Sequence, residues 1–185
     1  MFVSKPIRRW LYILLLAMLT WSGPTRAQTV SHEYPLKAVF LLNFAQFTDW
    51  PTNALAGAND PFVIGILGND PFGALLDETV RADNKDGHKF VIRRFQRTEE
   101  VGNCQMLFIC QSEARRLDDI LKALKGHPIL TVSEIDDSAY RGVTVRFVTE
   151  NNKIHLRVNT DSLKEANLTM SSKLLRLAEL VHTRK

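Results

Sequence analysis

Cysteine is scarce in this chain of 185 residues, which contains only two. Cys104 and Cys110 bracket an apolar run that is typical of a buried strand. Six residues of extended chain would separate their Cα atoms by roughly 20 Å, whereas a disulfide requires less than about 7 Å. We therefore expect two buried free thiols rather than an intrachain disulfide.

A surplus of one charge is also missing once the N-terminus is set aside. The whole chain has a net charge of +4, from 24 basic and 20 acidic residues. Lys5, Arg8, Arg9 and Arg26 precede residue 28 and no acidic residue does, so the remainder holds 20 basic and 20 acidic residues. Nucleic-acid binding needs clustered Lys and Arg to neutralise phosphates. The neutral remainder therefore gives no electrostatic basis for a nucleic-acid partner.

The most apolar run is too short for a membrane span. It extends from Leu11 to Trp21 and falls short of the roughly 20 residues that cross a bilayer. A basic start, this apolar centre and the small residues up to Ala27 are typical of a cleavable signal peptide. We expect residues 1–27 to be removed and residues 28–185 to form a single exported, periplasmic domain, with a retained anchor as the alternative.

Motifs for catalysis, nucleotides and metals are missing as well. Gly65, Gly68 and Gly73 surround a strand-to-helix turn, but they match neither the dinucleotide fingerprint nor a P-loop, and no Gly-x-Ser-x-Gly elbow occurs. The five histidines are scattered without metal-ligand spacing. Asp136 and Asp137 most simply form a solvated turn or a helix start. The sequence thus predicts no enzyme, no cofactor and no metal site.

Short apolar runs alternate with segments of helical spacing in the rest of the chain. We expect strands at 62–67, 89–95, 104–110 and 129–132. We expect helices at 35–49, from Pro71 behind an Asp70 cap, and from a Ser112 cap to Gly126. We expect a final helix with Leu174, Leu177, Ala178 and Val181 on one face.

A late hairpin completes the expected sheet. Residues 143–147 and 154–158 alternate between apolar and polar, and Asn151 and Asn152 supply a turn between them. Strands that alternate with helices form a mainly parallel sheet with helices on both faces. The sequence therefore predicts a three-layer α/β sandwich whose parallel sheet is extended by a C-terminal antiparallel hairpin.

The first expected helix is apolar over much of its circumference. Leu36, Phe40, Phe44 and Phe47 form one stripe, and other apolar residues point elsewhere. Such a helix is either enclosed by its own domain or buried by a partner. Aromatic side chains at helical spacing mostly belong to a core, but they also anchor interfaces. The candidate partner-binding residues are Phe40, Phe44, Phe47 and Trp50.

Five segments in register resemble the YfiR family of periplasmic regulators, which includes HmsC-like proteins. They are YPLKAVFLLNFAQFTDWP, VIGILGNDPFG, MLFICQSE, ILTVSEID and NLTMSSKLLRLAEL. The resemblance implies a non-enzymatic regulator that restrains the sensory domain of an inner-membrane diguanylate cyclase of the YfiN type, which lowers cyclic-di-GMP and biofilm output. Some members carry extra cysteines around the late hairpin, and their absence here puts redox control in doubt.

A second class of function stays open beside this protein–protein interaction. A periplasmic small-molecule receptor would hold its ligand at the carboxyl ends of the parallel strands, near Gly68–Gly73 and Ser133–Asp137. A filled crevice there would argue against it. The resemblance leaves the oligomeric state undecided, including a homodimer.

Overall fold

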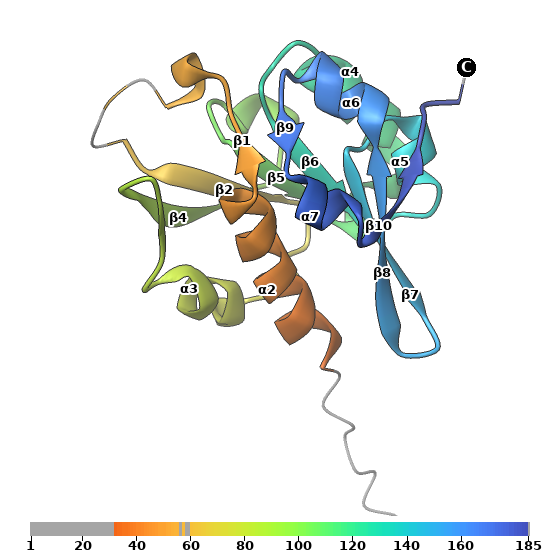
Figure 1. Cartoon of the computed structure of the whole chain (residues 1–185), viewed down its shortest axis with the longest axis horizontal. Coiled ribbons are helices and arrows are strands. Elements are labelled where there is room, and N and C mark those ends of the chain that lie inside the picture. The colour runs from red at the N-terminus through yellow and green to blue at the C-terminus, as the bar shows by residue number, and fades with distance from the viewer. Residues whose placement is uncertain (1–31, 56, 58–59, 185) are drawn as a thin grey trace, which may run out of the picture. The chain divides into compact units, whose positions relative to one another are not determined.

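The computed structural model describes residues 32–55, 57 and 60–184, so the expected signal peptide at residues 1–27 lies outside the described residues. The strands of the main sheet are β2 (Phe62–Leu67), β3 (Asn84–Lys85), β4 (His88–Phe95), β5 (Met106–Ile109), β6 (Leu130–Ser133), β7 (Val145–Glu150), β8 (Lys153–Asn159) and β10 (Ala178–Val181). Within the described residues their order is β10-β8-β7-β6-β5-β2-β4-β3 (Figure 1). From β4 through β2, β5 and β6 to β7, every neighbouring pair is parallel. The expected mainly parallel sheet is confirmed.

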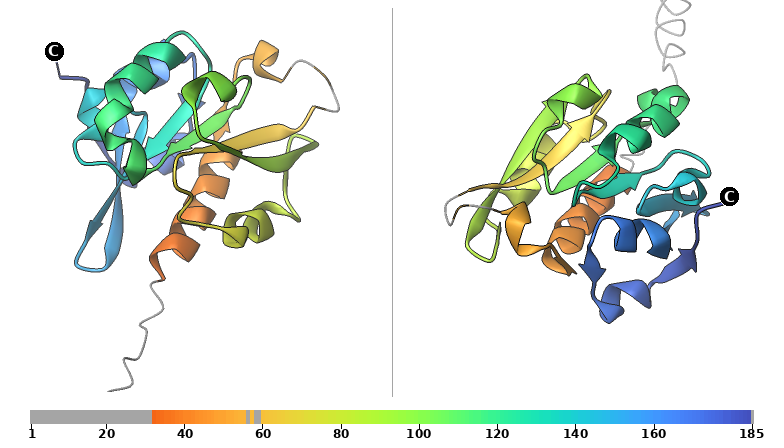
Figure 2. Two further views of the ribbon diagram at one scale, coloured as in Figure 1. Left: turned by 180° about the vertical axis from the view of Figure 1, so that it is seen from behind. Right: turned by 90° about the horizontal axis from the view of Figure 1, so that it is seen from above.

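Helices cover both faces of this sheet. The α-helices are α2 (Glu33–Gln46), α3 (Ala74–Val80), α4 (Leu117–Leu124), α5 (Ser138–Arg141), α6 (Thr160–Glu165) and α7 (Ser172–Leu175). Short 3-10 helices are η1 (Thr52–Ala54), η2 (Thr98–Glu100) and η3 (Gln111–Arg116). One core cluster lies between the sheet and α2 and α3, and a second lies between the sheet and α4. Figure 1 shows α2 in front of the sheet, and the view from behind in Figure 2 shows α4 on the other side.

The central strand β2 shows why the layers form. Its six residues are all buried. Because side chains alternate along a strand, Ile64 and Ile66 contact the core under α2, while Val63 and Leu67 contact the core under α4. This burial on both faces explains why β2 is continuously apolar, a pattern that is typical of parallel strands covered by helices.

The predicted hairpin is present between β7 and β8. The two strands pair antiparallel from Val145 with Val158 to Glu150 with Lys153. Asn151 and Asn152 both have positive φ, at 50° and 58°, as a two-residue turn that matches strand twist requires. Asparagine tolerates this backbone conformation better than most residues do.

The predicted final helix is wrong. The helix α7 ends at Leu175, and Ala178–Val181 form the edge strand β10, which pairs in parallel with β8. The apolar spacing at the end of the chain suits a helix, but it equally allows a short helix followed by a strand. Leu177 lies between the two elements and is 72% exposed, so it does not share a buried helix face with Leu174 and Val181.

Two predicted helix caps are also wrong, because the capping residues have other partners. Helix α3 begins at Ala74, three residues beyond Pro71, with Gly73 as its N-cap. Asp70 accepts a hydrogen bond from the Phe72 backbone N–H at 2.7 Å and pairs with Arg94, so it caps a turn instead. Ser112 lies within η3, and its hydroxyl accepts from the Asn69 backbone N–H at 3.0 Å.

The first helix is shorter than predicted at its C-terminus. Helix α2 ends at Gln46, and Thr48–Asp49 form β1, which pairs antiparallel with β9 (Thr169–Met170). This small two-stranded ladder joins the end of α2 to the chain that precedes α7. A contact between segments more than a hundred residues apart left no local signal in the sequence.

Both cysteines are free and buried, as their spacing predicted. Cys104 belongs to the core under α4, and Cys110 belongs to the core under α2. Burial raises the pKa of each thiol to about 12. Both side chains are therefore protonated at neutral pH, and thiolate chemistry is disfavoured.

Candidate functional site

Helix α2 has two apolar faces, and only one of them packs on the sheet. Ala38, Leu41 and Ala45 are fully buried on the inner face. Leu36, Val39 and Phe47 lie on the opposite side, where they are 47%, 46% and 45% exposed. Val39 follows Leu36 by three positions, and Phe47, the residue after the helix, follows Val39 by eight, about two turns, so these three lie along one exposed side of α2. We call it the outer α2 face.

The four aromatic candidates do not lie together on this face. Phe44 is fully buried, and its ring stacks on that of Phe147 with the centroids 5.7 Å apart. Phe40 is partly buried, with its ring 6.0 Å from Phe147. These two side chains therefore form the core, and Phe47 is the one of the four that is exposed.

Trp50 has a structural role at the start of the sheet. Its indole Nε1 donates a hydrogen bond to the Gln105 carbonyl at 3.0 Å. Its ring meets Phe62 edge-on, with the centroids 4.9 Å apart. A satisfied indole N–H and a packed ring anchor the segment after α2 to β2 and to the residue before β5.

The sequence analysis did not name Val39 as a candidate partner-binding residue. Its position on the helix, opposite Ala38, Leu41 and Ala45, was the available signal.

A fully buried lysine holds the first turns of α2 in place. Lys37 is 1% exposed, and its Nζ lies 2.5 Å from both Glu33 Oε1 and Glu134 Oε2. The ammonium also sits over two aromatic rings, 5.0 Å from the centroid of Tyr34 and 5.7 Å from that of Phe147. Lysine is almost never fully buried without such partners. The sequence analysis did not single it out, and the signal was a lone Lys four residues after Glu33 in an apolar helix.

The network around Lys37 joins α2 to two strands. Glu134 directly follows β6, and Thr149 on β7 donates its hydroxyl hydrogen bond to Glu33 at 2.8 Å. The Tyr34 hydroxyl donates to Glu134 at 3.3 Å. The ammonium of Lys37 lowers the pKa of Glu33, and burial, together with the Glu134 carboxylate, raises the pKa of Tyr34 to about 12. Glu33 is therefore ionised and Tyr34 neutral at pH 7, as the ion pair and the hydrogen bond require.

Comparison with known proteins assigns this arrangement to a family. The model of the YfiR/HmsC-like family matches residues 34–179. The chain belongs to the YfiR/HmsC-like family. The match covers α2 from its second residue onward, together with Lys37 and Glu134, and it confirms the resemblance seen in the sequence. The family is one of periplasmic, non-catalytic regulators.

Other comparisons add little to this assignment. No curated protein matches the chain. A solved structure of a substrate-binding protein with adhesive properties from Clostridium difficile, in its ligand-free, open form, is 13% identical with a TM-score of 0.46. The match covers 72% of this chain, which spans 58% of that protein. In the part of the chain that the structure describes, no helix has both the length and the apolar character to cross a membrane.

Side chains pack closely around Gly68, at the carboxyl end of β2, in this YfiR/HmsC-like protein. Gly68 has a φ of +96°, and a Cβ placed on it would lie 2.3 Å from the Ser112 hydroxyl. The ring of Tyr34 packs edge-on against Phe72 beside it, with the centroids 5.5 Å apart. The side chains of Ser112 and Glu113 therefore crowd the space at Gly68, whereas a Cβ at Gly73 would meet nothing within 4 Å.

Three carboxylates lie near Cys110 at the same end of the sheet. Burial is the main cause that raises the pKa of Cys110, and the carboxylates of Asp70, Glu134 and Glu113 raise it further. Each of these carboxylates is paired with a cation: Asp70 with Arg94, Glu113 with Arg116 and Glu134 with Lys37. Within the described ranges, no three His, Cys, Asp or Glu side chains come close enough to hold a metal ion.

Two hollows lined by described residues lie elsewhere. One, of about 370 Å³, opens at the amino ends of β2, β5 and β6, where Val63, Arg93, Cys104, His127 and Ile129 are among its lining residues. Another, of about 320 Å³, runs between α4 and α6. Neither corresponds to the two loops that the receptor hypothesis named, so the outer α2 face remains the stronger candidate for function.

Proposed function

We propose that this YfiR/HmsC-like protein binds and represses the sensory domain of an inner-membrane diguanylate cyclase of the YfiN type. It acts from the periplasm after removal of the signal peptide at residues 1–27. Lower cyclic-di-GMP then limits biofilm and exopolysaccharide output. Membership of the family supports the class of function, and the exposed outer α2 face is the observation that carries the interaction.

Three large apolar side chains on one face suit a protein partner. Leu36, Val39 and Phe47 are each about half exposed. Full burial of a large apolar side chain contributes roughly 1.5–3 kcal/mol, so covering the remaining half of all three contributes about 3 kcal/mol. An apolar helix face that enters a hydrophobic groove is a recurring mode of recognition.

The Lys37 network prepares this face for binding. Helix α2 is held at its first turns by Lys37 and at its end by the β1–β9 ladder and Trp50. A rigid helix loses little conformational entropy when a partner covers it. The same residues that stabilise the domain therefore also position the outer α2 face.

The experiment measures cyclic-di-GMP in a strain that expresses the partner cyclase. Deletion of the gene for this chain should raise cyclic-di-GMP, and the wild-type gene should restore the low level. The variant Val39→Asp should fail to restore it, because a charge at the centre of the apolar face must be desolvated on binding. The matched control is Val91→Asp, which introduces the same charge at a valine of β4 that is 36% exposed.

Two results would contradict the proposal. Unchanged cyclic-di-GMP after deletion, in the presence of the active cyclase, would exclude repression. Full restoration by a folded Val39→Asp protein would move the contact away from the outer α2 face.

A further inference from the structure

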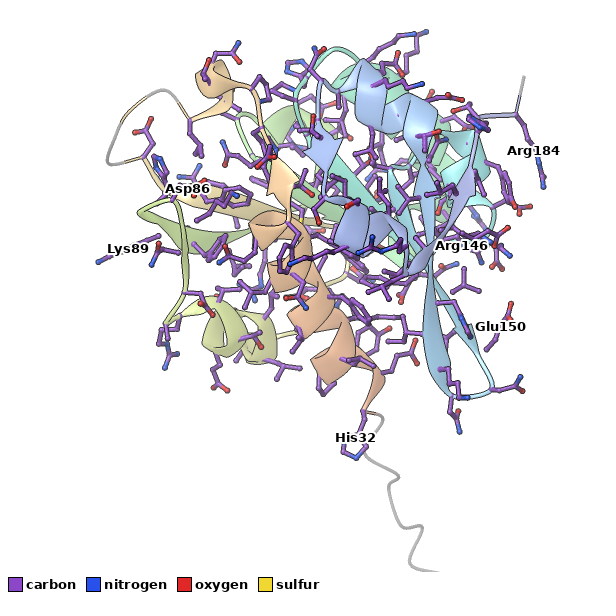
Figure 3. The ribbon with its side chains drawn as sticks, viewed as in Figure 1. His32, Asp86, Lys89, Arg146, Glu150 and Arg184 are labelled. Atoms are coloured by element: carbon purple, nitrogen blue, oxygen red, sulfur yellow. The ribbon has the colours of Figure 1, made fainter. Side chains whose placement is uncertain are left out.

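A row of charged side chains crosses the end of the sheet on the face opposite α2. Arg146 on β7 is in register with Ser133 on β6 and with Arg157 on β8, and Arg157 is in register with Glu179 on β10. Paired residues of neighbouring strands point to the same side of a sheet. Figure 3 labels Arg146 at this end, where β7, β8 and β10 meet.

Arg146 is buried, and one of its donors lacks a partner. The residue is 8% exposed, and its Nε finds no hydrogen-bond acceptor among the described residues. Its Nη2 pairs with Asp136 Oδ1, but the Asp136 side chain is 96% exposed. An ion pair with a solvated carboxylate is weak and readily exchanged. A buried N–H without an acceptor bears the full desolvation penalty of that group.

Nε, which has no acceptor, and Nη2, which is paired only with the exposed Asp136, form one edge of the guanidinium. The two N–H groups of such an edge match two oxygens of a single oxyanion. Arg94 and Arg116 use both nitrogens of that edge. Arg94 donates from Nε to Asp70 at 2.7 Å and from Nη2 to Asp77 at 2.6 Å. Arg116 directs both nitrogens to Glu113. By comparison, Nη2 of Arg146 has an acceptor and Nε has none among the described residues.

A second arginine, Arg157, lies beside Arg146 on the neighbouring strand. Arg146 and Arg157 are directly opposite each other on β7 and β8. Like charges in such a position destabilise a sheet. Arg157 donates its Nε to Glu179 at 2.7 Å. The ring of Tyr140 lies 5.8 Å from Arg157 and 4.1 Å from Arg184. An anion between Arg146 and Arg157 would relieve their repulsion.

We propose that Arg146 and Arg157 form a binding site for a small oxyanion, either a carboxylate or a phosphate group. The oxyanion accepts hydrogen bonds from Nε and Nη2 of Arg146 and displaces Asp136, which turns into solvent. The site lies on the opposite face of the sheet from the outer α2 face, so it does not depend on the proposed cyclase interaction.

The test titrates the purified protein with inorganic phosphate and, separately, with acetate at constant ionic strength. The side-chain Nε–H signal of Arg146 in an ¹⁵N NMR spectrum should shift saturably, with a Kd of about 1 mM or tighter. Asp136→Asn should tighten binding several-fold, because it removes the competing carboxylate. Arg146→Lys should abolish the rise in Tm that the anion causes in the wild type, because an ammonium cannot offer the two-pronged edge. Arg94→Lys is the matched control and should keep that rise.

The outcomes separate the sources of the anion and test the site. Saturation by phosphate alone supports a phosphate ligand, and saturation by acetate as well supports a carboxylate. An unmoved Arg146 signal with both probes overturns the proposal, as does an equal rise in Tm for a folded Arg146→Lys variant. If that variant does not fold, binding to Asp136→Asn that is no tighter than to the wild type overturns it.

Discussion

Replacing Lys37 with methionine removes the buried cation that holds α2 on the sheet. Methionine has a similar length and fills the space between the Tyr34 and Phe147 rings. It leaves Glu33 and Glu134 facing each other without the ammonium that lies 2.5 Å from each. The perturbation therefore tests charge with little change in packing volume.

The expected loss of stability is a few kcal/mol. Removing one partner of a buried ion pair destabilises a protein by about 3–5 kcal/mol, because the other charge is left unpaired. The carboxylates here are partly solvated, with side-chain exposures of 32% for Glu33 and 16% for Glu134. Water can therefore compensate part of the loss, and we expect about 2–3 kcal/mol for Lys37→Met.

Urea unfolding of the wild type and Lys37→Met at pH 7 measures this difference. The double variant Lys37→Met/Glu134→Gln should recover part of the stability, because it removes one of the unpaired carboxylates. A loss below about 0.5 kcal/mol, as is usual for surface substitutions, would refute the reasoning that the network holds α2. No recovery in the double variant would refute the assignment of the loss to unpaired charge.

The pH dependence supplies an independent check. Lys37 lowers the pKa of Glu33 in the folded state below the ordinary value of 4.5. Glu33 therefore contributes stability that is fully present above that ordinary value and is lost as the pH falls through the lowered, folded-state pKa. Lys37→Met should flatten this acid-side loss in urea titrations between pH 7 and the acid limit of folding. An unchanged slope would show that Lys37 does not shift the titration of Glu33.

Three further predictions follow from the packing. Gly68→Ala should destabilise the protein by about 2 kcal/mol or more in urea unfolding, because the new methyl group would clash with Ser112 at a positive φ, while Gly87→Ala, which has open space, should cost less. Phe44→Ala should cost about 3–5 kcal/mol, as a fully buried aromatic does, and a much smaller loss would contradict its place in the core. Cys104 and Cys110 should resist a thiol reagent at pH 8 in the folded protein and react after unfolding, because burial raises the pKa of both to about 12; rapid labelling of the native protein would contradict this.

The parts of the fold that could be predicted have local signals. The run of apolar residues in β2 marks a strand covered on both faces, and Asn151–Asn152 marks the hairpin turn, because each pattern is specific to one backbone geometry. The end of the chain has no such signal. Whether Ala178–Val181 continues a helix or forms an edge strand depends on its pairing with β8, and that pairing joins segments separated in the sequence.

The candidate site shows where a sequence alone stops. Apolar side chains around much of α2 indicated that the helix has more apolar surface than one contact requires, but Phe44 and Phe47 are the same residue type in the same helical stripe. Only the direction in which the sheet lies makes one a core residue at 0% exposure and leaves the other 45% exposed. Lys37 is buried although a charged residue is expected at the surface. Its two carboxylate partners come from the helix itself and from the loop after β6. The Lys37 network ties the first turns of α2 to β7 and to the loop after β6, and the apolar side chains on the far side of the helix stay exposed. If Lys37→Met weakens the proposed repression while Val91→Asp does not, the network that stabilises the domain and the proposed binding face act as one unit.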